Sequence, residues 1–183
     1  RDQEIRKIKD IILKGNQAYW VCTLIEQSDS LEAQAAEVIS AELKLALPEL
    51  SIGLIHGRLK AKEKIDIINK FKKKEVSLLV ATTVIEVGID APNATVMIIE
   101  NAERLGLSQL HQLRGRVGRG DVESFCILMY DKLSTIGQKR MQIMRETNDG
   151  FKIAEADLEL RGAGEILGTR QTGDIFFKIC LLY

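Results

Sequence analysis

The sequence has no long hydrophobic run and no excess of charge of either sign. None of its apolar stretches approaches the roughly 18 residues that a membrane-spanning helix needs, which excludes a transmembrane helix. Residues 1–14 form a charged, amphipathic segment, so we expect no signal peptide. The 26 basic residues balance the 26 acidic ones. Any contact with nucleic acid must therefore come from a local basic track on a neutral protein.

Cysteine and histidine are also scarce. The three cysteines, Cys22, Cys126 and Cys180, lie far apart, and with the two histidines they give no spacing typical of a metal site. An odd, scattered set of this kind indicates reduced thiols and favours a cytoplasmic protein. The two histidines also fit no persuasive Ser-His-Asp or Cys-His arrangement.

Three nucleotide-binding signatures are missing. The sequence has no G-x-x-x-x-G-K-[ST] phosphate loop and no acidic strand end suited to magnesium. No G-x-G-x-x-G follows the first predicted strand, which argues against an unrelated dinucleotide-binding domain. We therefore expect that this chain alone hydrolyses nothing quickly.

The residues that are present indicate a soluble α/β protein. Hydrophobic residues make up 45% of the 183 positions and charged residues 28%, enough for one domain plus an appendage. Short apolar runs alternate with segments of helical period, which predicts a parallel sheet with helices on both faces. The expected strands are 18–25, 51–55, 78–81, 96–99 and 124–129. The expected helices are 5–12, 31–47, 60–74 and 108–116.

Ligands of such folds bind in the loops that follow the carboxyl ends of the strands. This rule points to residues 56–58, 82–90 and 101–106. From about residue 131 the pattern changes to two helices, 134–147 and 151–160, split by a turn at 148–150 and followed by a glycine-rich stretch. We expect a sheet domain over residues 1–130 and a helical hairpin with an irregular tail over 131–183, cut from a longer protein.

The segment QLHQLRGRVGRG at residues 109–120 is the most informative one. Three arginines, Arg114, Arg116 and Arg119, are separated by glycines that let a backbone approach a ligand closely. Guanidinium groups bind phosphate oxygens in pairs. A basic surface loop is the alternative. Because a helix precedes the arginines and a strand follows them, we favour a phosphate site.

Residues 81–92, ATTVIEVGIDAP, form a second candidate segment. Thr82 and Thr83 at the end of a strand could hold a phosphate, Gly88 permits a tight turn, and Asp90 could bind a ribose hydroxyl. A plain junction between a strand and a turn is an equally good interpretation of these residues.

The third candidate is the trio His56, Gly57 and Arg58, which ends another strand. It places two donors in one loop, suited to the phosphate backbone of a nucleic acid, although a lone histidine is more often structural. The lysines of residues 60–74 alternate with acidic residues and indicate a solvated helix face.

Taken together, these segments resemble the C-terminal RecA-like domain of superfamily 2 helicases. Residues 81–90 resemble motif V of that superfamily, and residues 112–119 resemble its motif VI. The resemblance extends to the RecG family of branched-DNA translocases through IENAERLGL (99–107), NDGF (148–151), LRG (160–162) and LGTRQTG (167–173). One departure is Ala163, where a typical RecG has proline.

The resemblance implies a motor of two RecA-like domains that binds ATP and Mg²⁺ in the cleft between them. The phosphate loop would belong to the N-terminal RecA-like domain upstream of Arg1. The partner would be branched DNA, such as a replication fork, in repair and recombination. Arg119 would be the arginine finger, with Arg116 beside it. The remaining site residues would bind nucleotide (Gly88, Asp90, Gln112), face the DNA backbone (His56, Gly57, Arg58, Thr82, Thr83) or couple the two (Arg140, Arg161, Gln171).

Two alternatives stay open at this point. The transcription-repair coupling factor Mfd shares the arginine motif and the hairpin, although residues 100–103 and 148–150 favour the RecG family. The other alternative is a nucleic-acid-binding module without catalytic activity. A phosphate loop encoded just upstream would exclude the second alternative.

Overall fold

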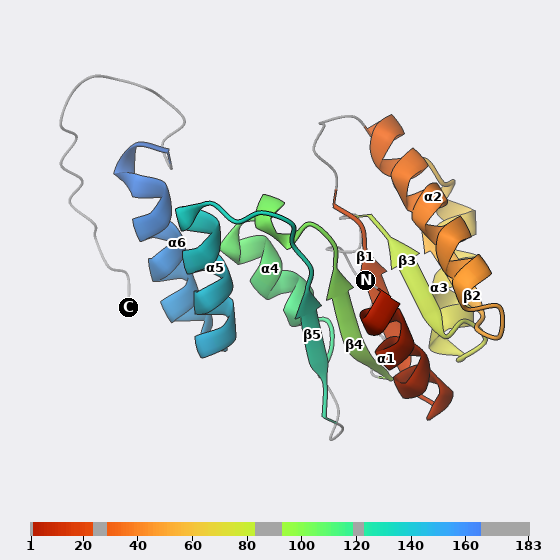
Figure 1. The fold of residues 1–183 in the computed structure, drawn as a ribbon. Coiled ribbons are helices and arrows are strands. Elements are labelled where there is room, and N and C mark those ends of the chain that lie inside the picture. The colour runs from red at the N-terminus through yellow and green to blue at the C-terminus, as the bar shows by residue number, and fades with distance from the viewer. Residues whose placement is uncertain (1, 24–28, 83–92, 119–122, 166–183) are drawn as a thin grey trace, which may run out of the picture.

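A five-stranded parallel sheet forms the centre of the molecule (Figure 1). The computed structural model describes residues 2–23, 29–82, 93–118 and 123–165. The strands are β1 (Gln17–Val21), β2 (Ile52–Ile55), β3 (Leu78–Ala81), β4 (Ala94–Ile99) and β5 (Phe125–Leu128), in the spatial order β2-β3-β1-β4-β5. All four neighbouring pairs are parallel, which confirms the predicted sheet.

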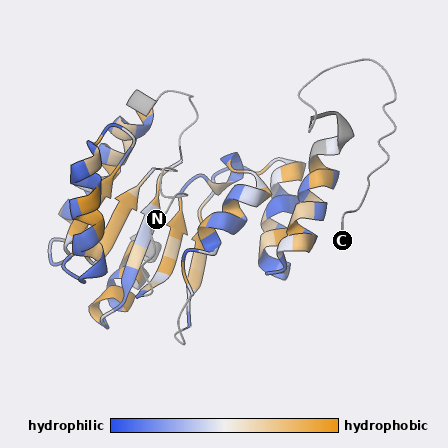
Figure 2. Cartoon of the chain, turned by 180° about the vertical axis from the view of Figure 1, so that it is seen from behind, coloured by the Kyte–Doolittle hydropathy of each residue, from blue (hydrophilic) through white to orange (hydrophobic). Residues whose placement is uncertain are grey.

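Helices cover both faces of the sheet. Because successive side chains of a strand point to opposite faces, the core is divided into one cluster on each face. Trp20 of β1 faces helices α1 (Asp2–Leu13) and α2 (Asp29–Ala46). Tyr19, its neighbour, belongs to the opposite cluster, with α3 (Ala61–Lys72) and α4 (Leu107–Arg114). Most of the strands are coloured as hydrophobic, whereas the helices carry many hydrophilic residues (Figure 2). The strand β3 is buried completely and is an unbroken apolar run in the sequence. Strands β1 and β4 are buried as fully and are apolar apart from Gln17 and Thr95.

Most element boundaries differ from the prediction by a few residues. The first strand begins at Gln17, one residue earlier than expected, and ends at Val21. A 3-10 helix, η2 (Ala102–Arg104), which was not predicted, connects β4 to α4. No helix in the described part of the chain is long and apolar enough to cross a membrane.

Gln17 starts β1 because its side chain has partners inside the protein. Its Nε2 atom donates to the backbone oxygens of Phe71 and Val76, at 2.6 Å each. The side chain thereby ties the start of β1 to the end of α3 and to the segment that leads into β3. The amide nitrogen is thereby satisfied within the fold, whereas the buried Oε1 of Gln17 has no hydrogen-bond partner among the described residues.

We expect Gln17→Ala to lower the free energy of unfolding by about 2 kcal/mol, because it removes two buried hydrogen bonds. Urea denaturation of the 183-residue chain, followed by circular dichroism, measures the change. Gln138→Ala is the control, because Gln138 is exposed on the surface. Equal stabilities of the two variants would contradict the role of Gln17.

Two helices follow the sheet, as predicted, with a break at residues 147–149. Helix α5 (Thr135–Glu146) begins after Ser134, whose Oγ accepts a hydrogen bond from the backbone N–H of Gly137 at 3.1 Å. Helix α6 (Gly150–Glu165) is longer than expected and includes Gly162 in a non-helical conformation, with φ 70°. The two helices lie side by side and pack on α4 (Figure 1). The division of the chain at residue 130 stays a prediction.

Candidate nucleotide and DNA interface

The loops that were predicted to carry the site emerge from one edge of the sheet. In the strand register Ala81 pairs with both Val21 and Ile55, so β1, β2 and β3 end level with each other. Ile99 pairs with Val21 and Leu128, which brings the ends of β4 and β5 to the same edge. The backbone N–H of Thr82 donates to the oxygen of Ile55 at 3.2 Å. The loops that begin at His56 and Thr82 are therefore neighbours.

The predicted DNA-facing residues divide into buried and exposed ones. His56 is 6% exposed and Thr82 is 1% exposed, whereas Gly57 and Arg58 are exposed. The Nε2 atom of His56 lies 3.5 Å from Oε1 of Glu37 on α2. His56 Nδ1 and Thr82 Oγ1 have no hydrogen-bond partner among the described residues. Thr83 lies outside the described residues, as do Gly88 and Asp90 of the predicted nucleotide contacts.

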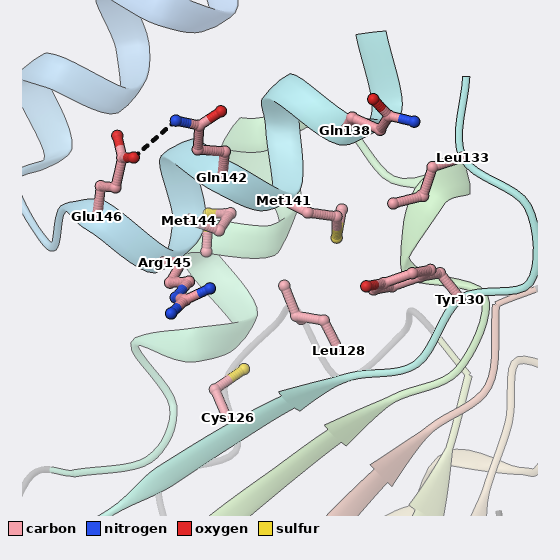
Figure 3. A pocket seen from close by; sticks show the side chains of 10 residues that line it. All are labelled: Cys126, Leu128, Tyr130, Leu133, Gln138, Met141, Gln142, Met144, Arg145 and Glu146. Atoms are coloured by element: carbon pink, nitrogen blue, oxygen red, sulfur yellow. Dashed lines mark hydrogen bonds between the residues drawn. The ribbon is translucent and has the colours of Figure 1, made fainter. Parts of the chain in front are cut away.

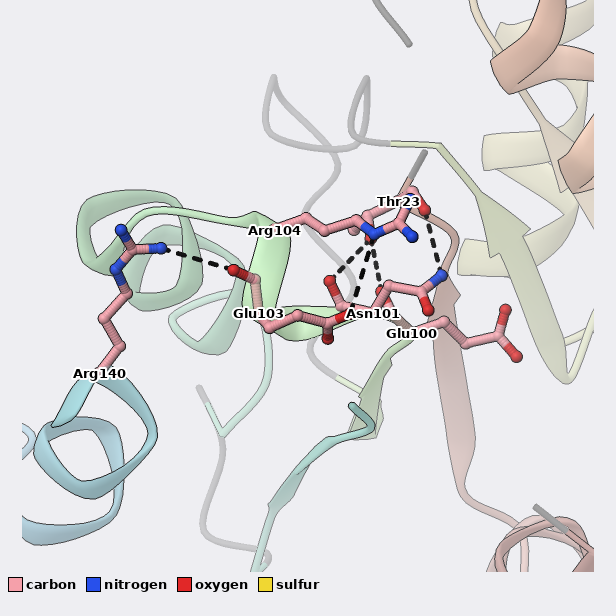
Figure 4. A network of polar contacts seen from close by, with 6 residues as sticks. All are labelled: Thr23, Glu100, Asn101, Glu103, Arg104 and Arg140. Carbon is pink, nitrogen blue, oxygen red and sulfur yellow. Dashed lines mark hydrogen bonds and ion pairs between the residues drawn. The ribbon is translucent and has the colours of Figure 1, made fainter. Parts of the chain in front are cut away.

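A polar clamp joins the ends of β1 and β4 (Figure 4). The Thr23 hydroxyl donates to the backbone oxygens of Glu100 (2.6 Å) and Asn101 (3.1 Å). In return, Nδ2 of Asn101 donates to the backbone oxygen of Thr23 at 3.3 Å. Asn101 has φ 49°, a left-handed conformation that asparagine tolerates better than most residues. Sequence reasoning placed residues 101–106 in a ligand loop but did not identify Thr23 and Asn101 as a pair.

Arg140, predicted as a coupling residue, connects α5 to the segment after this clamp. Its Nη1 atom donates to the backbone oxygens of Glu103 and Leu105, at 3.4 Å each. Figure 4 shows the arginine reaching from α5 toward η2. The backbone of Arg161 belongs to α6, but its side chain is outside the described part of the structure. Gln171 lies outside the described residues altogether.

The predicted phosphate-binding segment begins in α4. Gln112 is exposed near the end of the helix, and Arg116 lies half-buried just after it. The backbone N–H of Arg116 donates to the oxygen of Leu113 at 3.0 Å. Gly118 has φ 80°, so the chain turns there in a conformation that glycine adopts readily. Arg119, the predicted arginine finger, lies outside the described residues.

The structure corrects the interpretation of Arg114, which was grouped with the phosphate-binding arginines. Its Nη1 atom donates to the backbone oxygens of Met144 and Thr147, at 2.9 Å each, and its Nη2 atom lies 3.0 Å from Nδ1 of His111. Burial lowers the pKa of the Arg114 guanidinium below its ordinary value, yet an arginine stays charged in proteins. The Arg114 side chain is therefore hydrogen-bonded to the last turn of α5 in place of a phosphate.

A groove of about 760 Å³ separates the edge strand β5 from α5 (Figure 3). Cys126, Leu128, Tyr130, Met141 and Met144 give it a largely apolar lining. Burial raises the pKa of the Cys126 thiol to about 11, so this cysteine stays protonated and unreactive at neutral pH. In the described ranges, no group of three or more His, Cys, Asp or Glu is placed to hold a metal ion.

The parallel sheet, the level strand ends and the arginine segment after α4 define a RecA-like helicase domain. Residues 3–121 match the family model of the helicase conserved C-terminal domain, and the chain belongs to that family. Residues 147–181 match a second model, that of the C-terminal part of domain 3 of the ATP-dependent DNA helicase RecG. The similarity to RecG, inferred above from short motifs, is thereby confirmed.

Curated relatives carry the same similarity across most of the chain. The chain is 66% identical over 167 residues to the ATP-dependent DNA helicase RecG of Pasteurella multocida (strain Pm70), and the match covers 91% of this chain and 24% of the relative. It is 65% identical over 169 residues to RecG of Escherichia coli (strain K12), covering 92% of this chain and 24% of the relative. The chain thus spans about a quarter of the length of these relatives.

Solved structures agree with the fold. A structure of RecG bound to a three-way DNA junction matches with a TM-score of 0.75 and 41% identity, covering 90% of this chain and 21% of that one. The L327V variant of S. cerevisiae Dbp5 bound to RNA and ADP BeF3 matches with a TM-score of 0.55 and 16% identity, covering 85% of this chain and 36% of that one, which shows a shared fold alone.

Proposed function

We propose that this chain is the C-terminal motor half of an ATP-dependent DNA helicase or translocase that acts on branched DNA in repair and recombination. The observation that carries the proposal is the 65–66% identity to RecG over nine-tenths of the chain. The similar RecG in the solved structure is bound to a three-way DNA junction. This similarity favours RecG over the transcription-repair coupling factor and over a binding module without catalytic activity.

The described part of the arginine segment lies after α4 and beside the start of β5, at the opposite edge of the sheet from the loops after β2 and β3. Gln112 is exposed, and Arg116 follows a helix end that the core fixes in place. We assign Arg119, with Arg116, to stabilising the charge that develops during phosphoryl transfer. Gly88, Asp90 and Gln112 would contact the nucleotide. ATP, when bound, supplies the phosphoanhydride bond whose hydrolysis powers movement, with Mg²⁺ held mainly by the N-terminal RecA-like domain.

The loop after β2 fits a contact with the DNA backbone. Arg58 and Gly57 are exposed there, so a guanidinium and a backbone amide are available to phosphate oxygens. His56, which is buried beside Glu37, would hold this loop in place. Thr82 and Thr83, after the neighbouring strand β3, would contact further phosphates of the DNA backbone. Backbone contacts of this type carry no sequence preference and weaken as salt rises.

The helices after the sheet would convey domain closure to the DNA. Arg140 already bridges α5 to the segment that follows β4, which supports a coupling role for it. We extend that role to Arg161 and Gln171, and to residues 131–183 as a translocation element. The complete protein would act in the cytoplasm.

The test is ATP hydrolysis by the full-length protein, measured with forked DNA, with linear duplex and without DNA. We expect hydrolysis to increase strongly on the fork and to fall as salt rises. The 183-residue chain alone should not hydrolyse ATP, because the phosphate loop would lie upstream of it. A full-length protein that binds forks but hydrolyses ATP equally with and without them would contradict the proposal.

A further inference from the structure

The loop after β2 begins with a tight turn. The backbone N–H of Leu59 donates to the backbone oxygen of His56 at 3.2 Å. This hydrogen bond closes a four-residue turn with Gly57 and Arg58 at its two central positions. Both central residues are exposed, whereas His56 is buried at the start of the turn. The turn therefore presents Arg58 to solvent at the edge of the sheet that is proposed to face the DNA.

One lysine of α3 is hydrogen-bonded to the middle of this turn. The Nζ atom of Lys64 donates to the backbone oxygen of Gly57 at 2.9 Å. Lys64 is half-buried, whereas the other lysines of the helix are exposed, namely Lys62, Lys70 and Lys72. The sequence indicates the same solvated face for all of these lysines. The structure separates Lys64 from the rest, because its side chain reaches back by seven residues to the turn.

Two further contacts hold the ends of the turn. The backbone N–H of Lys60, directly after the turn, donates to Oε2 of Glu63 at 2.9 Å. On the other side, Nε2 of His56 lies 3.5 Å from Oε1 of Glu37 on α2. The hydrogen bond from Lys64 adds a contact at the centre. Its loss would therefore free the middle of the turn without releasing the two ends.

The stability of the helix does not account for a lysine at this position. Lys64 is the fourth residue of α3, close to the positive amino end of the helix dipole, where a cation is unfavourable. Its hydrogen bond lies on the surface, so water can replace it, and the net contribution to folding is small. The contact therefore matters for the conformation of the turn more than for the stability of the chain.

A fixed turn favours binding of a phosphate by Arg58. A guanidinium binds phosphate oxygens best where its planar set of donors meets them directly. When a side chain or loop becomes ordered only on binding, the lost conformational freedom reduces the affinity. A turn that is already held at Gly57 leaves less of this freedom to be lost when DNA arrives.

We propose that Lys64 is a positioning residue for DNA binding, which holds the turn at Gly57 so that Arg58 faces a phosphate of the DNA backbone. This proposal rests on the function proposed above and on its assignment of Arg58 to the DNA. In this role Lys64 acts through Arg58. A direct contact between the Lys64 ammonium group and the DNA is the alternative that the experiment distinguishes.

The experiment is a double-mutant cycle in the full-length protein, with Lys64→Met, Arg58→Ala and the double variant. The affinity for forked DNA is measured by fluorescence anisotropy at several salt concentrations. We expect Lys64→Met to weaken binding about threefold to tenfold, the cost of ordering one flexible group on binding. Arg58→Ala should weaken binding and lower the slope of log affinity against log salt by about one, as the loss of one phosphate contact does. In the Arg58→Ala background, Lys64→Met should cause no further loss, because the two residues act as one unit.

A loss from Lys64→Met that is equally large in both backgrounds would overturn the positioning role and assign Lys64 to a direct DNA contact. Lys72→Met is the matched control, since it removes the same charge from an exposed position at the other end of α3. It should bind forks nearly as tightly as wild type. If Lys72→Met weakens binding as much as Lys64→Met does, the effect is one of net charge and the proposal is overturned.

Two readouts separate positioning from a general structural role. The urea midpoint of unfolding and the rate of ATP hydrolysis without DNA should both be unchanged in Lys64→Met, and a fall in both would overturn the proposal. Lys64→Arg restores a charged donor, so it should recover most of the affinity that Lys64→Met loses.

The cycle also shows which proposal fails. If Arg58→Ala binds forks like wild type, the turn is not a DNA contact, and the role of Lys64 is overturned while the helicase function stands. If the wild-type protein binds no forked DNA, the proposed function itself fails, and the role of Lys64 fails with it.

Discussion

Arg119→Ala in the full-length protein is expected to lower the kcat of fork-stimulated ATP hydrolysis by about a thousandfold or more. An arginine finger stabilises charge on the transferred phosphoryl group, and the removal of such a finger costs about 10³–10⁵ in kcat. Forked-DNA binding should be retained, because the DNA contacts are assigned to the loops after β2 and β3 and not to this segment. Steady-state kinetics at saturating ATP and a fork-binding assay measure the two quantities.

The matched control for Arg119→Ala is Arg145→Ala, which removes an exposed arginine from α5. It should leave kcat and DNA binding as in wild type. An Arg119→Ala variant that keeps its kcat would remove Arg119 from the ATP site. A variant that loses hydrolysis together with DNA binding would instead assign Arg119 to the DNA track.

Trp20→Ala is expected to destabilise the chain by about 3–5 kcal/mol, the usual cost of deleting a large aromatic side chain from a core. Trp20 lies on the central strand with no exposed surface, packed against α1 and α2. Since domains of this size are stable by about 5–15 kcal/mol, the loss is a large part of the total. Urea denaturation followed by circular dichroism measures it without relying on tryptophan fluorescence.

Trp20→Phe gives a sharper comparison at the same position. The indole N–H of Trp20 has no acceptor among the described residues, so phenylalanine removes an unpaired donor while it keeps most of the apolar contact. We expect less than half of the alanine effect. Leu45→Ala, on a side chain that is 84% exposed, should change stability by less than about 0.5 kcal/mol. Equal losses for Trp20→Ala and Leu45→Ala would contradict the core role of Trp20.

The fold could be predicted because its signals are local. Buried parallel strands appear as unbroken apolar runs, and the helices repeat their apolar residues with helical period. The break between α5 and α6 was recognised from asparagine, aspartate and glycine at 148–150, and Thr147 and Asp149 do make hydrogen bonds there. The start of β1 at Gln17 was missed because its partners, Phe71 and Val76, are distant in the sequence.

The candidate site was predicted less completely, for the same physical reason. Arg114 looked like a phosphate ligand because guanidinium groups bind both phosphates and helix-end carbonyls, and only the approach of α5 distinguishes the two. The three-residue spacing of Ser108, His111 and Arg114 was a usable signal for a helix contact, and the Ser108 hydroxyl does donate to Asp157 of α6. For Thr23 and Asn101 no sequence signal existed, because their clamp forms only when β1 and β4 lie side by side.

The double packing of α4 has a consequence for how the chain folds. Its buried leucines share one core cluster with residues of β1, β4, α5 and α6, so the face of the sheet that α4 covers and the two final helices have a common hydrophobic interior. A cut at residue 130 would remove α5 and α6, which pack on α4. We therefore expect both parts to unfold in one cooperative transition, so that α5 and α6 cannot loosen without disturbing the helix that leads into the arginine segment.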